Sequence, residues 1–402
     1  MNALSDRIFT FCLLWIFILL PQMPEAFAQE PPEPFAKDSD FLWSLNVKGE
    51  GIIGRFTPDG ANVFFPEMFG ARGYPKGKLT FLEATTGKVV STFSPCRGEE
   101  FDIYVYRRQG ASFETTGNLM MVSCLSGGIE LWNFKHEKLL GIFPARGKEP
   151  AISPDGTRLV TSDVTSNDSP ELWNTESQAR IAILQSNRNG GWHTPLAVSF
   201  SADSKMVAIS YHTEVRVWDA VHGKPLVSFE NNEGVRDGKR GDLSPESRVY
   251  DLMFTSDGKT IVTGTGRAIK FWDVDTGKLK YKSSEGHKAL LDDLAITPDG
   301  SILATATKDK FIKLWDMETG KLILRLPKPE ESTQEILFSP NGKNLLYRAW
   351  GSQRSILYDV ATGRIIWKAK YGAVSHVFSP GWDIVLVKDF KNKVIRAYKM
   401  SL

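Results

Sequence analysis

TPDGSILATATKDKFIKLWDMETGKLILRLP, residues 297–327, decides the fold of this chain. It opens with a Pro-Asp-Gly turn, in which proline presets φ and glycine tolerates positive φ. The runs SILATAT, FIKLWDM and LILRLP are typical of strands, and tight turns separate them. Together with the alternating segment ALLDDLAI just before the turn, this unit predicts four antiparallel strands joined by short reversals.

The same unit recurs along the chain. Turns of one shape lie at 56–60, 113–117, 152–156, 200–204, 254–258, 296–300, 338–342 and 378–382. Seven of them are followed by a second reversal, which is clearest in VWDAVHGK (217–224), FWDVDTGK (271–278) and LWDMETGK (314–321). Successive turns are 39 to 57 residues apart, a period that indicates a repeat architecture.

A four-stranded sheet with two largely apolar faces is not stable alone in water. Radial stacking of such sheets around an axis buries both faces, which is the β-propeller solution. No helical period is sustained after residue 28, so a helical solenoid is rejected. We therefore expect an all-β propeller of eight four-stranded blades, with seven as the alternative if the irregular unit around 113–117 is an insertion.

The last repeat lacks a fourth strand. The chain reaches VIRAYKM at 394–400, and no further strand follows. The segment FLWSLNV at 41–47 alternates apolar and polar residues and precedes the first repeat. We expect it to complete the last blade, because such a closure removes an exposed sheet edge.

The Trp-Asp dipeptides of the chain resemble those of the WD40 family. They stand at 218–219, 272–273 and 315–316, with near matches at 132–133, 173–174 and 358–359. The resemblance covers about residues 41–400 and is strongest in units four to six. It implies a buried hydrogen-bonded tetrad in the sixth unit, made of His287, Thr307, Asp309 and Trp315, and it matches ring closure by strands from both termini.

The N-terminal residues have the pattern of an export signal. Arg7 precedes the apolar run 8–20, which is too short for an ordinary membrane span, and Ala26-Phe27-Ala28 forms a small-x-small cleavage pattern. We expect cleavage after Ala28, with an uncleaved anchor as the alternative. Residues 29–40 contain three prolines and predict a linker before one propeller domain, 41–402, in a secreted or periplasmic, bacterial-type protein.

The composition is that of a well-folded globular protein without a strong charge. Of 402 residues, 42% are hydrophobic and 24% charged, and the formal net charge is +2. Removal of residues 1–28 takes away Arg7, Asp6 and Glu25, which leaves 48 basic and 45 acidic residues. Neither sign dominates, so we expect no nucleic-acid partner. We also expect no membrane span in the mature chain, and a monomer.

Two cysteines remain after the signal, Cys96 and Cys124. Cys124 falls in the strand-like run LMMVSC, where a buried free thiol is the commoner state. A disulfide between the two stays open at this point, because the sequence does not show whether their Cβ atoms approach each other. No CxxC pair and no zinc-ligand spacing occurs.

Long connections predict a binding surface on one rim of the propeller. Segments 68–79, 94–110, 163–170, 185–193 and 230–248 vary in length, whereas the Pro-Asp-Gly and Thr-Gly-Lys turns are short. Loops on a rigid scaffold commonly carry binding sites, and aromatic and arginine side chains dominate interface energetics. The candidates are Tyr104, Tyr106, Arg107, Arg108, Trp192, His193, Arg236, Arg240, Arg348 and Trp350.

Catalytic motifs are absent from the sequence. There is no H-E-x-x-H, no G-x-S-x-G and no Walker loop, and the six histidines are scattered. We expect no catalytic residue, no metal and no cofactor. The favoured function is a protein- or peptide-binding scaffold of the exported compartment. The alternatives are a propeller enzyme or ligand-binding protein that uses the central channel, with His376 as the channel candidate, and a structural module of a cell-envelope assembly.

Overall fold

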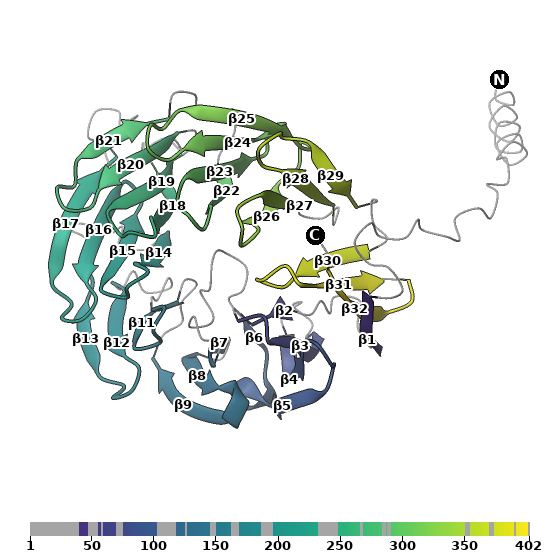
Figure 1. The fold of residues 1–402 in the computed structure, drawn as a ribbon. Coiled ribbons are helices and arrows are strands. Elements are labelled where there is room, and N and C mark those ends of the chain that lie inside the picture. The colour runs from purple at the N-terminus through teal and green to yellow at the C-terminus, as the bar shows by residue number, and fades with distance from the viewer. Residues whose placement is uncertain are drawn as a thin grey trace, which may run out of the picture.

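The computed structural model contains eight four-stranded antiparallel sheets, arranged around a common centre (Figure 1). It describes residues 40–46, 55–57, 59–69, 75–102, 118–124, 127–144, 150–161, 169–185, 196–231, 248–265, 268–283, 287, 291–349, 354–369, 374–389 and 391–400. The prediction of eight blades is confirmed. The seven-blade alternative is wrong, because the irregular second unit supplies a complete blade of its own.

The first four blades follow the order of the chain from the innermost to the outermost strand. Blade one consists of β2 (Arg55–Phe56), β3 (Asn62–Phe69), β4 (Pro75–Glu83) and β5 (Val89–Phe93). Blade two consists of β6 (Phe101–Asp102), β7 (Leu119–Cys124), β8 (Ile129–Asn133) and β9 (Lys138–Phe143). Blade three consists of β10 (Ala151–Ile152), β11 (Arg158–Thr161), β12 (Glu171–Asn174) and β13 (Arg180–Ile183). Blade four consists of β14 (Ala197–Phe200), β15 (Met206–Tyr211), β16 (Glu214–Asp219) and β17 (Pro225–Glu230).

Blades five to seven repeat this order. Blade five consists of β18 (Val249–Phe254), β19 (Thr260–Thr265), β20 (Ile269–Asp273) and β21 (Leu279–Lys282). Blade six consists of β22 (Leu291–Ile296), β23 (Ile302–Thr307), β24 (Phe311–Asp316) and β25 (Leu322–Pro327). Blade seven consists of β26 (Thr333–Phe338), β27 (Asn344–Ala349), β28 (Ser355–Asp359) and β29 (Ile365–Lys368).

Strands from both ends of the chain form blade eight. It consists of β30 (Val374–Phe378), β31 (Ile384–Asp389), β32 (Val394–Lys399) and β1 (Phe41–Asn46), with β1 outermost and paired to β32. The indole Nε1 of Trp43 donates to the Ala84 carbonyl of blade one at 2.7 Å, which ties the closing strand to the next blade. The predicted closure by residues 41–47 is therefore confirmed.

The core is divided into eight apolar clusters, each between two neighbouring blades. Between blades six and seven, for example, Leu314 and Leu326 pack with Leu345 and Ile356, all nearly inaccessible to solvent. Because every sheet buries both of its faces in this way, the strand interiors are apolar on both sides, unlike a sheet with one face in water. The ring is thus stabilised by inter-blade packing.

The turn between the first and second strands of a blade is held by its own side chains. In blade three the Ser153 hydroxyl donates to the Asp155 carboxylate at 2.6 Å and accepts from the Arg158 amide at 2.9 Å. The fourth residue of this turn has positive φ and is usually glycine, such as Gly156 at 74°. Ser204 occupies this position in blade four, with a φ of 62°, and Trp382 occupies it in blade eight, with a φ of 55°. Four residues thus build the turn even where glycine is absent.

Glycines of the turn between the third and fourth strands also set the distance between blades. Gly87, Gly223, Gly277, Gly320 and Gly363 all have positive φ, and a Cβ on each would lie within 3.0 Å of a side chain in the preceding blade. For Gly87 that side chain is the indole of Trp43, so the same device closes the ring. Only glycine satisfies both the backbone conformation and this close approach.

Helical structure is minor in the described residues. Two short 3-10 segments occur, η2 (Pro95–Gly98) and η3 (Phe134–His136). Across the described ranges, we find no helix whose length and apolar character would allow it to span a bilayer. The predicted signal at 1–28 and all but the last residue of the linker at 29–40 lie outside the described residues.

Candidate binding face and blade network

The antiparallel blades have two different ends. Since each chain reversal changes direction, the first-to-second and third-to-fourth connections lie at one end, here called the turn face. The second-to-third and fourth-to-first connections lie at the other end, here called the connection face. The connection face includes the longest fourth-to-first connections, 184–196 and 231–248, which join blade three to four and blade four to five.

Two predicted loops are assigned differently by the structure. Most of 68–79 belongs to β3 and β4, whose pairing reaches Phe69 opposite Pro75, so the connection shrinks to 70–74. Of 94–110, only 94–100 joins blade one to blade two, because β6 begins at Phe101 and pairs with β7. Residues 103–118 therefore connect a first strand to a second strand, which is a turn-face connection. The sequence showed no break at Phe101 that would separate the two.

Most of the candidate binding residues lie outside the described residues. This holds for Tyr104, Tyr106, Arg107, Arg108, Trp192, His193, Arg236, Arg240 and Trp350. In the chain, Tyr104, Tyr106, Arg107 and Arg108 fall between β6 and β7. The others fall in the connections 184–196, 231–248 and 350–354, all of which belong to the connection face.

Arg348 is a strand residue and not a rim residue. It lies on β27 with 5% of its surface exposed, and its Nη1 donates to Glu335 Oε2 on the neighbouring β26 at 2.9 Å. A buried guanidinium needs a carboxylate partner, so this pair is explained by the fold. The prediction that Arg348 contributes to the binding rim is therefore not supported.

His376 lies on the innermost strand of blade eight, as predicted, but its side chain is fully buried. The ring is 0% exposed and stands edge-on to Trp367 of blade seven, with 4.7 Å between the ring centroids. A residue that lines a hydrated channel would be accessible to solvent. The placement of His376 therefore gives no support to a channel ligand site.

The predicted tetrad of blade six is assembled, with one residue more than expected. His287 Nδ1 lies 3.1 Å from Asp309 Oδ2, and Nε2 lies 2.7 Å from the hydroxyl of Thr305. The indole of Trp315 donates to the same hydroxyl at 2.8 Å. Thr307, which the family resemblance had suggested for this role, lies 3.4 Å from His287 Nδ1 and accepts the Asp309 amide at 3.2 Å. Thr305 is thus the central hydroxyl of the network.

The register between the second and third strands explains why Thr305 takes this role. Trp315 stands opposite Leu303, and the hydroxyl that it reaches is two residues further along the same strand. Equivalent bonds join Trp173 to Thr161 and Trp272 to Thr263, each at 2.9 Å. The recurring threonine was visible in the sequence, but the register that selects it was not.

Proton positions in the network follow from its donors and acceptors. The Trp315 indole N–H donates to the Thr305 hydroxyl, and this hydroxyl can donate to Nε2 of a neutral His287. The Nδ1–H of His287 then donates to the ionised carboxylate of Asp309. Burial lowers the pKa of His287, which favours this neutral form. Burial alone would raise the pKa of Asp309, but hydrogen bonds from His287 and the Phe311 amide outweigh it and hold that pKa well below its usual range.

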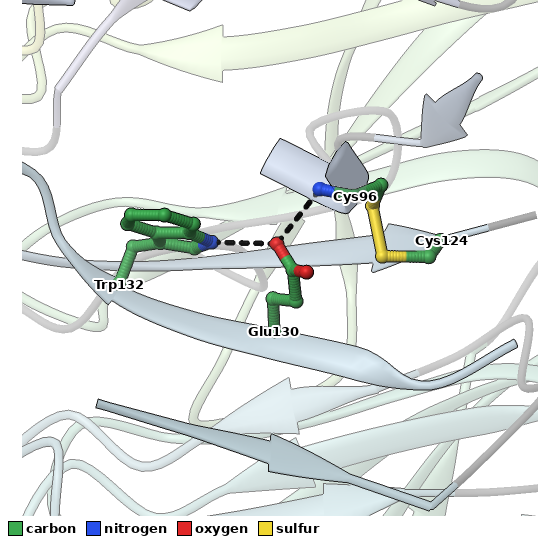
Figure 2. The surroundings of a disulfide bond; sticks show 4 residues. All are labelled: Cys96, Cys124, Glu130 and Trp132. Atoms are coloured by element: carbon green, nitrogen blue, oxygen red, sulfur yellow. Dashed lines mark hydrogen bonds between the residues drawn. A yellow bond between two sulfur atoms is a disulfide. The ribbon is translucent and has the colours of Figure 1, made fainter. Parts of the chain in front are cut away.

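Blade two replaces this network by a disulfide and a buried carboxylate (Figure 2). Cys96 and Cys124 are bonded, with 5.4 Å between their Cα atoms, so the free-thiol expectation for Cys124 is wrong. Glu130 Oε2 accepts from the Cys96 amide at 2.9 Å and from the Trp132 indole at 2.8 Å. The Glu130 position, two residues before the tryptophan, is basic in blades four to six and forms cation–π contacts there: Arg216 with Trp218, Lys270 with Trp272, and Lys313 with Trp315.

The disulfide also determines whether a metal ion could bind at the one potential group of metal ligands found in the described ranges. Ligand atoms of Cys96, Cys124 and Glu130 lie within 4.8 Å of one another. Metals bind thiolates, and both sulfur atoms are here bonded to each other. The group is therefore no metal site in this state.

Comparison with known proteins agrees with the repeat pattern. The model of the family "WD domain, G-beta repeat" matches residues 240–273 and 278–316, which correspond to units five and six. The two matched segments are thus similar to WD40 repeats. The WD40-like chain is also 24% identical over 198 residues to WD repeat-containing protein SL1-17 of Schistosoma mansoni, a match that covers 48% of this chain and 59% of that relative's length.

A solved structure shares the fold. The computationally designed Ika8 protein matches with a TM-score of 0.61 and 17% sequence identity, over 90% of this chain and 100% of that one. At this identity the likeness concerns the architecture alone. The propeller architecture of this chain is thus shared with a solved structure, and its ligands do not follow from that likeness.

Proposed function

We propose that the protein is a non-catalytic scaffold of the exported compartment that binds a protein or peptide through its connection face. WD40 propellers generally act as protein-interaction scaffolds, and two repeats of this chain match that family. The observation that carries the proposal is the difference between the two ends of the blades. The turn face is built mainly from short reversals that satisfy their own hydrogen bonds, whereas the longest fourth-to-first connections, 184–196 and 231–248, lie at the other end.

The candidate contact residues are those that strand order assigns to the connection face. They are Trp192, His193, Arg236, Arg240 and Trp350. Aromatic and guanidinium groups supply large contact area and directed hydrogen bonds, and they are enriched among residues that dominate binding energy. The near-neutral net charge favours a partner recognised by such contacts over a polyanion.

Affinity capture from envelope and culture-supernatant extracts tests the scaffold function. Trp192→Ala with His193→Ala, and Arg236→Ala with Arg240→Ala, should each lose the captured partner. Matched substitutions of exposed turn-face residues, Lys205→Ala and Glu318→Ala, should retain it. An unchanged set of partners for both connection-face variants would contradict the assignment of the face.

The exported location is a separate part of the proposal. It rests on the apolar run and the Ala26-Phe27-Ala28 pattern. Sequencing of the mature N-terminus should give Gln29 as the first residue in material recovered from the periplasm or medium. A chain that begins at Met1 and is recovered from the cytosol would contradict the exported location. That result would not bear on the proposed binding face.

A further inference from the structure

The Cys96–Cys124 disulfide stands where blade six has its hydrogen-bonded tetrad. Met120 pairs with Trp132 just as Leu303 pairs with Trp315, so the two blades can be compared position by position. In this register Cys124 corresponds to Thr307, at the end of the second strand. Cys96 lies in the connection that enters the blade, as His287 does in blade six. A covalent bond thus takes the place of the side-chain contact that fixes the entering connection.

The connection held by this bond has an unfavourable backbone conformation. Cys96 and Arg97 both have left-handed φ, at 51° and 54°, although neither is glycine. Non-glycine residues disfavour this region, and two in succession are uncommon. Apart from the disulfide, the amide of Cys96 is anchored by Glu130, and the Cys96 carbonyl accepts the Glu99 amide at 3.0 Å. The disulfide is therefore a chemically breakable anchor of this connection, beside the Glu130 contact and the backbone bridge between Lys76 and Glu100.

The surroundings of the bond couple it to blade two and to the neighbouring blade one. Glu130 joins the Cys96 amide to the Trp132 indole (Figure 2). Trp132 also stacks on Phe93 of blade one, with 4.5 Å between ring centroids. Both cysteines belong to the apolar cluster between blades one and two. Release of the connection would thus change the contacts of Trp132 and its packing against Phe93.

We propose that Cys96–Cys124 is a redox-controlled latch of blade two, and that thiol–disulfide exchange with a dithiol is the modification that opens it. The dithiol supplies two electrons and two protons and becomes a disulfide, while the Cys96–Cys124 bond breaks to give two thiols. Cys96 and Arg97 then leave the left-handed region, and Glu130 loses the Cys96 amide. The other seven blades keep their own contacts. The latch does not depend on the function proposed above.

Hydrogen exchange of the purified chain, oxidised and after treatment with dithiothreitol, tests the latch. Thiol titration of the native protein should show that both cysteines become free. Exchange in a peptide over 93–102 should then rise roughly tenfold or more, as expected for local opening, while a peptide over 302–316 in blade six stays unchanged. Reoxidation should restore the protected state.

A double variant provides the second arm. Cys96→Ser with Cys124→Ser should show fast exchange over 93–102 without any reductant and should not respond to it. The latch is overturned if the native disulfide resists dithiothreitol until the whole protein unfolds. It is equally overturned if both thiols are released, or the double variant is folded, and exchange over 93–102 does not change.

Discussion

Thr305 shows how one hydroxyl organises a blade. It accepts the indole N–H of Trp315 and contacts His287 Nε2, and it has 0% exposure. A buried polar group left without its partner costs more than the hydrogen bond itself contributes. Thr305 therefore controls two other buried polar groups, whereas Thr307 makes longer contacts.

Substitution of the two threonines separates their roles. Thr305→Val should lower the free energy of unfolding by about 2–3 kcal/mol, because it strands the Trp315 indole and His287 Nε2. Thr307→Val, the same change on the same strand, should cost about 1 kcal/mol or less. Urea unfolding measures both, and a larger loss for Thr307→Val would contradict the assignment of the central hydroxyl.

The blade-six network also predicts a dependence on pH. Since the folded pKa values of His287 and Asp309 are both lowered, the unfolded chain binds more protons as the pH falls. The contribution of His287 is complete above its unfolded pKa of about 6.5 and is lost below it, and that of Asp309 is lost below about 4.

Replacement of His287 should flatten this dependence. Between pH 7 and 5, His287→Gln should reduce the slope of unfolding free energy by up to about 1.4 kcal/mol per pH unit. His222→Gln, which removes a histidine whose side chain is 65% exposed, is the control. Equal slopes for wild type and His287→Gln would show that the imidazole is not held neutral by burial.

The turn between the third and fourth strands works as a spacer between blades. Its glycine has positive φ and lies against the outer strand of the preceding blade, as Gly223 lies against Ala182. An added Cβ there would come within 2.2 Å of Ala182 Cβ, closer than real contacts allow. The element thus fixes the blade spacing as well as the chain reversal.

Three glycines with the same φ of +69° allow a matched test. Gly258→Ala should cost about 1 kcal/mol, since its Cβ meets only the flexible end of Met206 at 3.4 Å and the loss is conformational. Gly87→Ala and Gly223→Ala add overpacking and should cost about 2–4 kcal/mol. Thermal and urea unfolding report the difference, and equal costs at all three positions would refute the spacer role.

Strands from both ends of the chain close the ring of blades. β1 pairs with β32, covers its edge and places Trp43 in the cluster between blades eight and one. Without β1, the edge of β32 is open for pairing with another chain. Without β1 the chain should therefore be less stable and should associate through this edge.

Deletion of residues 41–46 tests this closure. Loss of Trp43 alone should cost about 3–5 kcal/mol. The truncated chain should also associate in a concentration-dependent manner, measured by light scattering after size exclusion, and a synthetic peptide of residues 41–47 added in trans should reverse this. A truncated chain that is as stable as wild type, and that associates no more than wild type does, would show that β1 is dispensable.

The sequence predicted the architecture well, because the turns and tryptophans that repeat are local signals. Blade number, the closing strand and the tetrad neighbourhood all follow from such signals. Local signals did not predict the role of Thr305, the disulfide or the start of β6 at Phe101. Each of these depends on strand register or on the approach of Cβ atoms across a sheet. Arg348 was misplaced for the same reason, as its partner Glu335 lies on the neighbouring strand.

We propose that the repeated turns form a rigid frame and that recognition takes place on the connection face. Hydrogen exchange of the purified protein, alone and with the protein captured in the affinity experiment, tests this proposal. We predict protection in the connections 184–196 and 231–248, with exchange in the turns 152–156, 254–258 and 296–300 unchanged. Protection confined to those turns would contradict the claim.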